Sequence, residues 1–487
     1  MITSPPSPLP LWARLTDVLV IVIAAAALSV AVFGGFRVVL FGAQITAHEP
    51  FRPLVVAAVL FAVRHLVHRS PSLGARMSAA LRSFVAAESV RAIAPAFVWS
   101  RIAVLLVATL SISTFGYSNA VPFRLSKSEM ANLPARWDAG WYLGIARTGY
   151  EYDRRARRQQ NVVFFPAYPL LMRTAGIFFG GHVDDRAAVE TRLVNLLWSG
   201  VAVNLAALAA ALGYLYRMVR AYADRDIAVT TVTLALAYPT AFVYNVPYTE
   251  GLFLLGSVAT FYHFGRQQFV SAALWGTVIG LSRPNGFILA APLVMIALAR
   301  SGPFPGLAPW VDRLNTRSDL PKHLWRDLAV ALTPFLGLMM YCGYLYWTWG
   351  DPFVWARVQG AWGRSYEGFA PALQSMNSVA EHGVSGYATR SGYEVLNVLP
   401  FMLAVGAAIP IAWRLGLAYS TLILLTLMPP LMAGGWLSMA RMTITLFPIY
   451  IFLALAIPEK HRAGVLVLFA LLQGLGASLF FTWRPFY

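Results

Sequence analysis

Long apolar stretches separated by short polar segments run through most of this chain of 487 residues. Many of these stretches are about 17 to 25 residues long, the length an α-helix needs to cross roughly 30 Å of hydrocarbon. The short alternating strands of a membrane β-barrel do not stand out. The pattern therefore predicts an all-α polytopic integral membrane protein.

We expect about thirteen membrane-crossing helices. The first apolar run, from Val18 to Phe41, is too long for the core of a signal peptide and lacks a convincing cleavage site, so we expect a retained helix. The expected crossings lie near residues 18–41, 53–68, 97–117, 190–215, 227–245, 251–265, 270–282, 286–300, 328–349, 396–414, 416–433, 443–457 and 464–483.

The distribution of charge predicts how these helices are oriented. The chain is 58% hydrophobic and 12% charged, with a net charge of +17. Its basic residues are spread over loops that flank the membrane, which favours anionic lipid over nucleic acid as a partner. The arginine-rich connection between Arg64 and Arg91 is expected to be cytoplasmic by the positive-inside rule. The following helix then delivers the loop 118–190 to the extracytoplasmic face.

The segment 166–180 is apolar enough to be counted as a further crossing. If it crossed, the basic loops at residues 217–225 and 300–326 would both lie outside, against the positive-inside rule. We therefore interpret it as a helix at the membrane interface, started by Pro166 and Pro169 and interrupted by Arg173. The N-terminus is then inside and the C-terminus outside.

In the loop 118–190, Asp138 is the only acid between Glu129 and Glu151, and it lies between Trp137 and Trp141. A carboxylate at the start of a short interfacial helix is suited to accept a proton from an attacking hydroxyl, and the helix N-terminus favours its ionised form. The same position is also typical of a plain helix N-cap. Both interpretations stay open, and they are compatible.

Other polar residues on the expected outer side form two groups of candidates. Arginines that run against the charge trend are suited to a phosphate, or else they snorkel at helix breaks: Arg283, Arg441, Arg147 and Arg364. A second group could contact a sugar or an acceptor, or else belong to an interfacial aromatic belt and to helix caps: Trp137, Tyr142, Asn161, Tyr168, Tyr248, Glu250 and Asn285.

Two acidic pairs resemble metal sites. Asp224-Arg225-Asp226 has the spacing of a pair that holds a divalent metal, but its place in a short turn before an apolar helix favours capping. Asp184-Asp185 near His182 lacks further ligands in the sequence. We expect neither a metal nor another cofactor, and Cys342 as the single cysteine allows no internal disulfide.

Several motifs stand out along the chain. They are Arg136-Trp137-Asp138-Ala139-Gly140-Trp141-Tyr142, Phe164-Phe165-Pro166-Ala167-Tyr168-Pro169-Leu170, Pro247-Tyr248-Thr249-Glu250-Gly251, Ser282-Arg283-Pro284-Asn285-Gly286 and Ser438-Met439-Ala440-Arg441. Together they make most of residues 97–457 resemble the PIG-V family, the second mannosyltransferase of glycosylphosphatidylinositol synthesis, and its prokaryotic relatives. At one later motif Pro284 replaces the family's more usual serine.

The resemblance implies the GT-C fold, in which interfacial helices of the first large outer loop carry a catalytic aspartate, here Asp138. It divides the chain into an N-terminal lead with a two-helix extension (1–96), a transmembrane catalytic core (97–457) and a C-terminal helix with an outer tail (458–487). It also implies a polyprenyl-phosphate-linked sugar, usually mannose, as donor.

We therefore expect an inverting glycosyltransferase in the cytoplasmic (inner) membrane, with its site facing the periplasm or exterior. Its acceptor would be a glycolipid, a glycan or a protein. The alternative is a transporter or flippase of lipid-linked sugar, which would place polar residues along a path through the membrane midplane.

Overall fold

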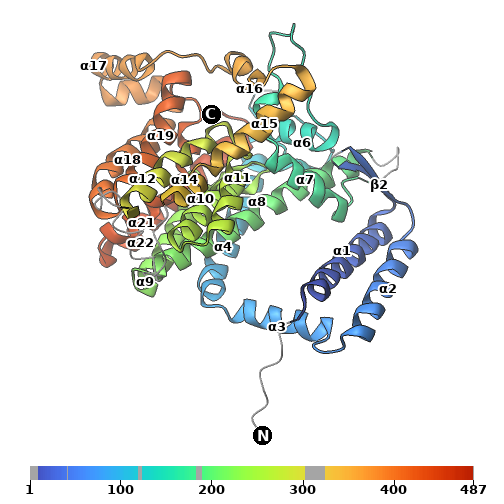
Figure 1. The fold of residues 1–487 in the computed structure, drawn as a ribbon. Coiled ribbons are helices and arrows are strands. Elements are labelled where there is room, and N and C mark those ends of the chain that lie inside the picture. Colours follow the sequence, from blue (N-terminus) through green and yellow to red (C-terminus); the bar gives the residue numbers. More distant parts are fainter. Residues whose placement is uncertain (1–8, 41, 119–122, 183–188, 302–323, 486–487) are drawn as a thin grey trace.

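The computed structural model describes residues 9–40, 42–118, 123–182, 189–301 and 324–485. Helices make up nearly all of the regular structure in these ranges, as the hydrophobic pattern predicts (Figure 1). The helices long and apolar enough to cross a membrane are α1 (Leu11–Phe33), α4 (Glu88–Phe115), α8 (Val189–Arg220), α18 (Gly392–Arg414), α19 (Leu417–Gly434) and α22 (Glu459–Phe481).

The expected number of about thirteen crossings is not confirmed. Within the described ranges six helices qualify, or seven if α14 (Leu324–Ala331) and α15 (Thr333–Trp349), bent by 43°, form one span. Polar motifs cut most of the remaining apolar runs into shorter helices and 3-10 turns. These are α2 (Phe51–Val67), α9 (Arg225–Ala237), η2 (Ala241–Asn245), α10 (Glu250–Gly265), α11 (Phe269–Gly280), η3 (Pro284–Leu289), α12 (Ala290–Ser301) and α21 (Phe447–Ala456).

The first predicted helix is wrong at its C-terminal end. α1 stops at Phe33, and a β-hairpin follows in which β1 (Phe36–Leu40) pairs antiparallel with β2 (Ala43–Ala47). Gly34 adopts a positive φ of 93°, and a Cβ on Gly35 would lie 2.8 Å from the Cα of His48. These two glycines allow the chain to leave the helix at this point. The length of the apolar stretch alone does not reveal where the helix ends.

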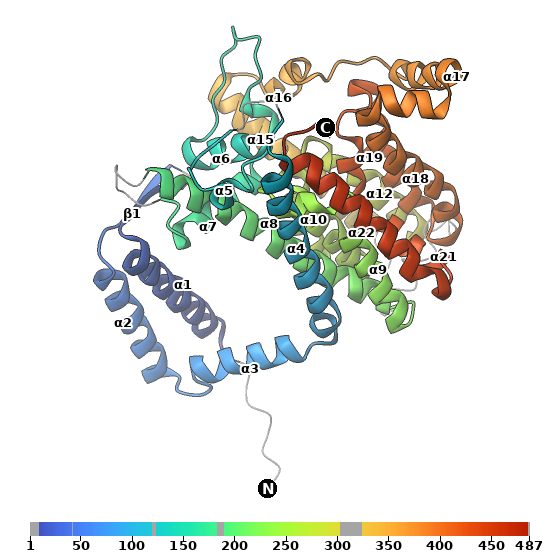
Figure 2. The same cartoon turned by 180° about the vertical axis from the view of Figure 1, so that it is seen from behind.

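The orientation of α4 and α8 supports the interfacial interpretation of the segment 166–180. Glu88, at the start of α4, pairs with Arg220, at the end of α8, with 3.1 Å between Oε1 and Nε. The two helices therefore run in opposite directions, and the intervening α7 (Ala167–Phe178) adds no crossing. Figures 1 and 2 show α6 (Ala139–Thr148) and α7 at one end of the molecule and α3 (Leu73–Ala86) at the opposite end.

The N-terminal extension is held together near one end of α1 and attached to the rest of the molecule near the other end. At one end, Asp17 pairs with Arg64 of α2 and with Arg76 of α3. At the other end, the Ser29 hydroxyl donates to the carbonyl oxygen of Ile177 in α7 at 2.7 Å. Between these attachments α1 and α2 stand beside the main bundle (Figure 1).

The main bundle is built around α8 and α10, which pack closely. Gly251 in α10 allows this approach, because a Cβ there would lie 2.4 Å from the carbonyl oxygen of Asn204. The packing fixes the end of α10 that begins at Glu250. The remaining elements are the short α5 (Glu129–Asn132), η1 (Asn161–Val163), α16 (Val354–Arg357), η5 (Val358–Trp362) and α20 (Met439–Thr443), and the longer α17 (Ala370–Arg390).

Candidate active site

Asp138 occupies the N-cap position of α6, as predicted, but its side chain makes no capping hydrogen bond to that helix. Its Oδ2 instead accepts a hydrogen bond from Nη1 of Arg441 in α20, at 2.7 Å. This is the short distance expected for a charge-assisted hydrogen bond. The carboxylate is therefore committed to a residue 303 positions away in the chain rather than to its own helix.

The turn that presents Asp138 is held in a strained conformation. Trp137 has a φ of 49°, a left-handed value that a bulky residue rarely adopts. The Tyr248 hydroxyl lies beside this turn, accepting from the backbone N–H of Asp138 at 3.0 Å and donating to the carbonyl oxygen of Arg136 at 3.1 Å. Tyr248 thus fixes the backbone on both sides of Trp137.

The side chain of Arg136 anchors the same turn to the C-terminal helix. This guanidinium is 1% exposed and donates to the carbonyl oxygens of Phe481, Asn132 and Ala135 and to the Tyr117 hydroxyl. Burial lowers the pKa of Arg136. These hydrogen bonds offset the cost of burying the charge of Arg136. By anchoring the turn to the C-terminal helix, Arg136 fixes the position of Asp138.

Glu250, Arg283 and Arg441 form an ion-pair cluster next to Asp138. Oε1 of Glu250 lies 3.4 Å from Nη1 of Arg283 and 3.3 Å from Nε of Arg441. Arg441 therefore bridges the two carboxylates. The structure brings these four residues together from the residue preceding α6, α10, the residue preceding η3 and α20, as expected for one site formed by distant turns.

The side chains of this cluster differ in depth. The exposed fraction is 2% for Glu250, 10% for Arg283, 14% for Arg441 and 24% for Asp138. The accessible side of the cluster therefore carries Asp138 and Arg441, and Glu250 lies beneath them.

Arg364 lies near this cluster but its guanidinium is used by the protein. It donates to the carbonyl oxygens of Leu437 at 3.0 Å and of Pro430 at 3.4 Å. Burial, followed by the positive charges of Arg441 and Arg283, lowers the pKa of Arg364 to about 10. It remains protonated at neutral pH and adds a third positive charge to this region while bracing the turn that carries Arg441.

Several predicted sugar or acceptor contacts instead hold the protein together. The side chain of Asn161 bonds to the backbone of Glu151 and Gly149, and the Tyr168 hydroxyl donates to the carbonyl oxygen of Gly200. Tyr142 is buried next to the cluster, where burial and then the negative charge of Glu250 raise its pKa. Of the predicted contacts, Trp137 and Asn285 are half-buried.

Arg147 is separated from the cluster. It is exposed in the last turn of α6, and nine residues of helix place it about 13 Å along the axis from Asp138. The neighbouring arginine run is exposed as well, at Arg154, Arg155, Arg157 and Arg158.

Sequence reasoning assigned no role to Asn204, which supports the site from below. Its amide accepts from the backbone N–H of Gly251 and donates to the carbonyl oxygens of Tyr244 and Val246. The sequence did contain a signal for this role, because Asn204 lies in the middle of an apolar helix and a buried amide needs hydrogen-bond partners. It fixes the segment that leads into Glu250.

The two acidic pairs do not gain support as metal sites. Asp224 caps α9, accepting from the N–H of Ile227 at 2.8 Å, which confirms the capping interpretation. Asp184 and Asp185 lie outside the described residues. In the described part of the chain, no three His, Cys, Asp or Glu side chains gather as metal ligands would.

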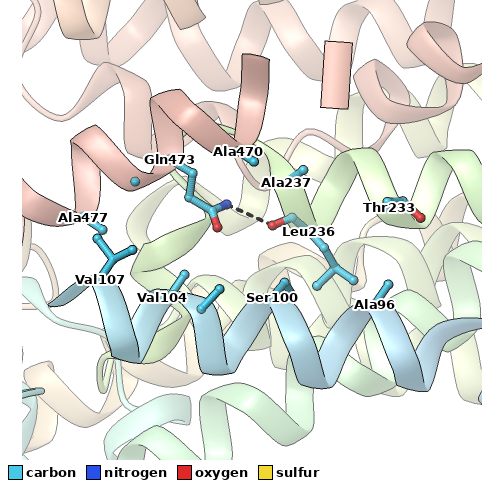
Figure 3. Close-up of a pocket in the computed structure, with 12 residues that line it drawn as sticks. Ala96, Ser100, Val104, Val107, Thr233, Leu236, Ala237, Ala470, Gln473 and Ala477 are labelled. Carbon is cyan, nitrogen blue, oxygen red and sulfur yellow. Dashed lines mark hydrogen bonds between the residues drawn. The ribbon is translucent and has the colours of Figure 1, made fainter. Parts of the chain in front are cut away.

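A separate cavity of about 250 Å³ lies among α4, α9 and α22 (Figure 3). Its lining consists mostly of alanine, valine and other small side chains, with Ser100, Thr233 and Gln473 as its polar members. Gln473 donates to the carbonyl oxygens of Leu236 and Tyr238, so its amide group is already satisfied. This cavity offers no ionisable group for chemistry.

Fold and site together define an integral membrane protein of many helices, with carboxylates and arginines gathered at one end of its bundle. A profile of the family described as Mannosyltransferase (PIG-V) matches residues 96–348, slightly more than half of the chain, and the chain belongs to this family. The match contains Asp138, Glu250 and Arg283 and ends before Arg441.

Curated relatives agree with this family. The chain is 30% identical over 231 residues to GPI mannosyltransferase 2 of two strains of the fungus Cryptococcus neoformans. The aligned part is 46% of this chain and 52% of the fungal protein, so the chain spans about half the length of these curated relatives.

Solved structures that are similar include two of the oligosaccharyltransferase of Archaeoglobus fulgidus. The one tethered to an acceptor peptide has a TM-score of 0.38 and 14% identity, and covers 80% of this chain and 55% of that one. The one in complex with an inhibitory peptide and a dolichol-phosphate has a TM-score of 0.37 and 12% identity, with 80% and 56% coverage.

Proposed function

We propose that this protein is an inverting glycosyltransferase that moves a sugar, mannose by its family, from a polyprenyl-phosphate-linked donor to an acceptor hydroxyl. The observation that carries the proposal is the partly exposed carboxylate of Asp138, held on the accessible side of the cluster that Arg441, Glu250 and Arg283 form. A proton acceptor and phosphate-binding groups then lie next to each other, as this transfer requires.

In the proposed reaction Asp138 accepts the proton of the acceptor hydroxyl. The acceptor oxygen forms a bond to the anomeric carbon, from the face opposite the phosphate. The bond between that carbon and the phosphate oxygen breaks, and the lipid phosphate leaves with the bonding electrons. Arg441 and Arg283 stabilise the charge that grows on the leaving oxygen, and removing one such donor typically costs about 3 to 4 kcal/mol of barrier.

The formal charge of the site supports a donor with one phosphate. Asp138 and Glu250 carry two negative charges, against three positive charges on Arg283, Arg441 and Arg364. The remaining charge of +1 matches a phosphodiester, which carries one negative charge. A diphosphate-linked sugar carries two and would require further neutralisation. The proposed chemistry therefore needs no metal ion.

The proposed location is the cytoplasmic membrane, with the site on the extracytoplasmic face. α3 carries Arg76 and Arg82 and lies at the end of the molecule opposite to α6 (Figure 2). The ion pair between Arg220 and Glu88 belongs to that same opposite end. The positive-inside rule then favours a cytoplasmic position for that end. The acceptor would be a glycolipid, a glycan or a protein that reaches the outer face.

The test is a transfer assay with purified protein in EDTA-containing buffer. Polyprenyl-phosphate sugars are supplied one at a time with an extract of native lipids, and the expected result is consumption of the mannose donor with formation of a new glycoside. The Asp138→Asn variant serves as the inactive control. Movement of a labelled lipid-linked sugar between leaflets without any glycoside would contradict the proposal and favour a flippase.

A further inference from the structure

Glu250 occupies an unusual place in the candidate site. Among the ion pairs of the described residues, it is the carboxylate that pairs with both Arg283 and Arg441, through the same oxygen Oε1. The two arginines are 158 positions apart and belong to different elements, so they share no local geometry. Their common contact with Glu250 fixes where one guanidinium lies relative to the other.

The backbone around Glu250 is itself firmly held. Gly251 is bonded to Asn204, and the Thr249 hydroxyl donates to the carbonyl oxygen of Ser282, which directly precedes Arg283. Glu250 therefore has a fixed position. The loop that carries Arg283 is attached to this position by the Thr249 hydrogen bond and by the ion pair between Arg283 and Glu250.

The exposed fractions of these side chains distinguish two possible roles for Glu250, contact with the sugar and positioning of the two arginines. A residue that contacts the sugar should be reachable from the accessible side of the site, but Glu250 is 2% exposed, whereas both arginines are more exposed. A ligand that approaches from the accessible side meets Arg441 and Arg283 first. We infer that Glu250 is a positioning residue, which holds these two guanidinium groups in the arrangement that binds the donor phosphate.

This inference rests on the proposed function, and it makes a prediction opposite in sign to simple electrostatics. Removing a negative charge beside two arginines should strengthen the binding of an anion if charge alone matters. If Glu250 positions the arginines, its loss should weaken phosphate binding, because the two groups no longer converge. A direct sugar contact would leave the binding of a sugar-free lipid phosphate unchanged.

The probe is polyprenyl monophosphate, which carries the phosphate but no sugar. Its binding to the full-length purified protein is measured for the wild type and for Glu250→Gln, with Glu151→Gln as the matched control. Glu151 is an exposed carboxylate in the outer loop, so its replacement makes the same change in net charge. We expect Kd to rise at least about tenfold for Glu250→Gln, a loss of about 1.4 kcal/mol, and to stay within about twofold for Glu151→Gln.

Equal or tighter binding of polyprenyl monophosphate by Glu250→Gln would overturn the positioning role. If that variant does not fold, Glu250→Asp keeps the charge and withdraws the carboxylate by one methylene, and the positioning role then requires the same weakening. A wild-type protein that binds no polyprenyl monophosphate would instead contradict the proposed donor. The two failures are distinguished because the second is seen without any substitution.

Discussion

Two clusters of acids and arginines in this protein have similar composition and different construction. In the N-terminal cluster, Asp17 pairs with Arg64 and Arg76, and the Arg64 side chain is fully buried. Arg64 also donates to the carbonyl oxygens of His68 and Pro71. In the candidate site, by contrast, the acids and arginines come from four distant elements, and Asp138 remains 24% exposed.

The two clusters are suited to different roles. The N-terminal cluster joins α1, α2 and α3, which follow one another in the chain, and it encloses its charges in protein. It acts as a structural connection between helices. The Asp138 cluster leaves its most reactive carboxylate and Arg441 partly accessible, so a ligand can compete for them. Such incompletely enclosed charges are typical of functional sites.

The strongest test of this comparison is Asp138→Asn. We expect kcat for sugar transfer to fall by at least about 10³-fold, because the amide cannot accept the proton of the acceptor hydroxyl. The thermal unfolding temperature and the binding of polyprenyl monophosphate should stay close to wild type. A variant that keeps near-normal turnover in the transfer assay would remove Asp138 from the role of base.

Substitution of Arg441 by glutamine should have the next largest effect. We expect a loss of about 10²- to 10³-fold in kcat, since one donor to the leaving phosphate is removed. Arg484, which donates to the carbonyl oxygen of Gly116 near the end of α4, provides a control arginine outside the cluster. Arg484→Gln should retain most of the turnover measured in the same assay, and an equal loss in both variants would speak against a specific role for Arg441.

The opposite behaviour is expected for Asp17→Asn in the N-terminal cluster. Leaving the buried guanidinium of Arg64 without its counter-charge should cost about 3 to 5 kcal/mol of stability. The measurement is the unfolding temperature in detergent, together with transfer activity per folded molecule, which should be unchanged. If activity falls and stability does not, the N-terminal cluster contributes to function after all.

The smallest effect is expected for Arg147→Gln. This side chain is exposed at the far end of α6, and exposed substitutions usually change stability by no more than about 0.5 kcal/mol. Donor KM and kcat should stay within about twofold of wild type. A large increase in donor KM would show that Arg147 reaches the phosphate in the donor complex, as first predicted.

The sequence made some parts of this site predictable. Asp138 stood out because an isolated acid between two tryptophans is unusual in so apolar a chain, and Arg283 and Arg441 because they ran against the charge trend. Asn161 and Tyr168 were suggested for contact with a sugar, but the structure commits their polar atoms to backbone partners. A polar residue in a loop looks the same in sequence whether it binds a ligand or the chain itself.

The amino-acid sequence was sufficient to identify a helical membrane protein, because hydropathy depends on neighbouring residues and the helix length needed to cross depends on the thickness of the bilayer. It also predicted the short helix that begins after Asp138 and an interfacial position for α7. The three-dimensional fold was needed to show that Glu250 lies beneath Arg283 and Arg441, and that Asp138 pairs across the bundle instead of capping its own helix. Such contacts join residues hundreds of positions apart, and their distances depend on how every intervening helix packs.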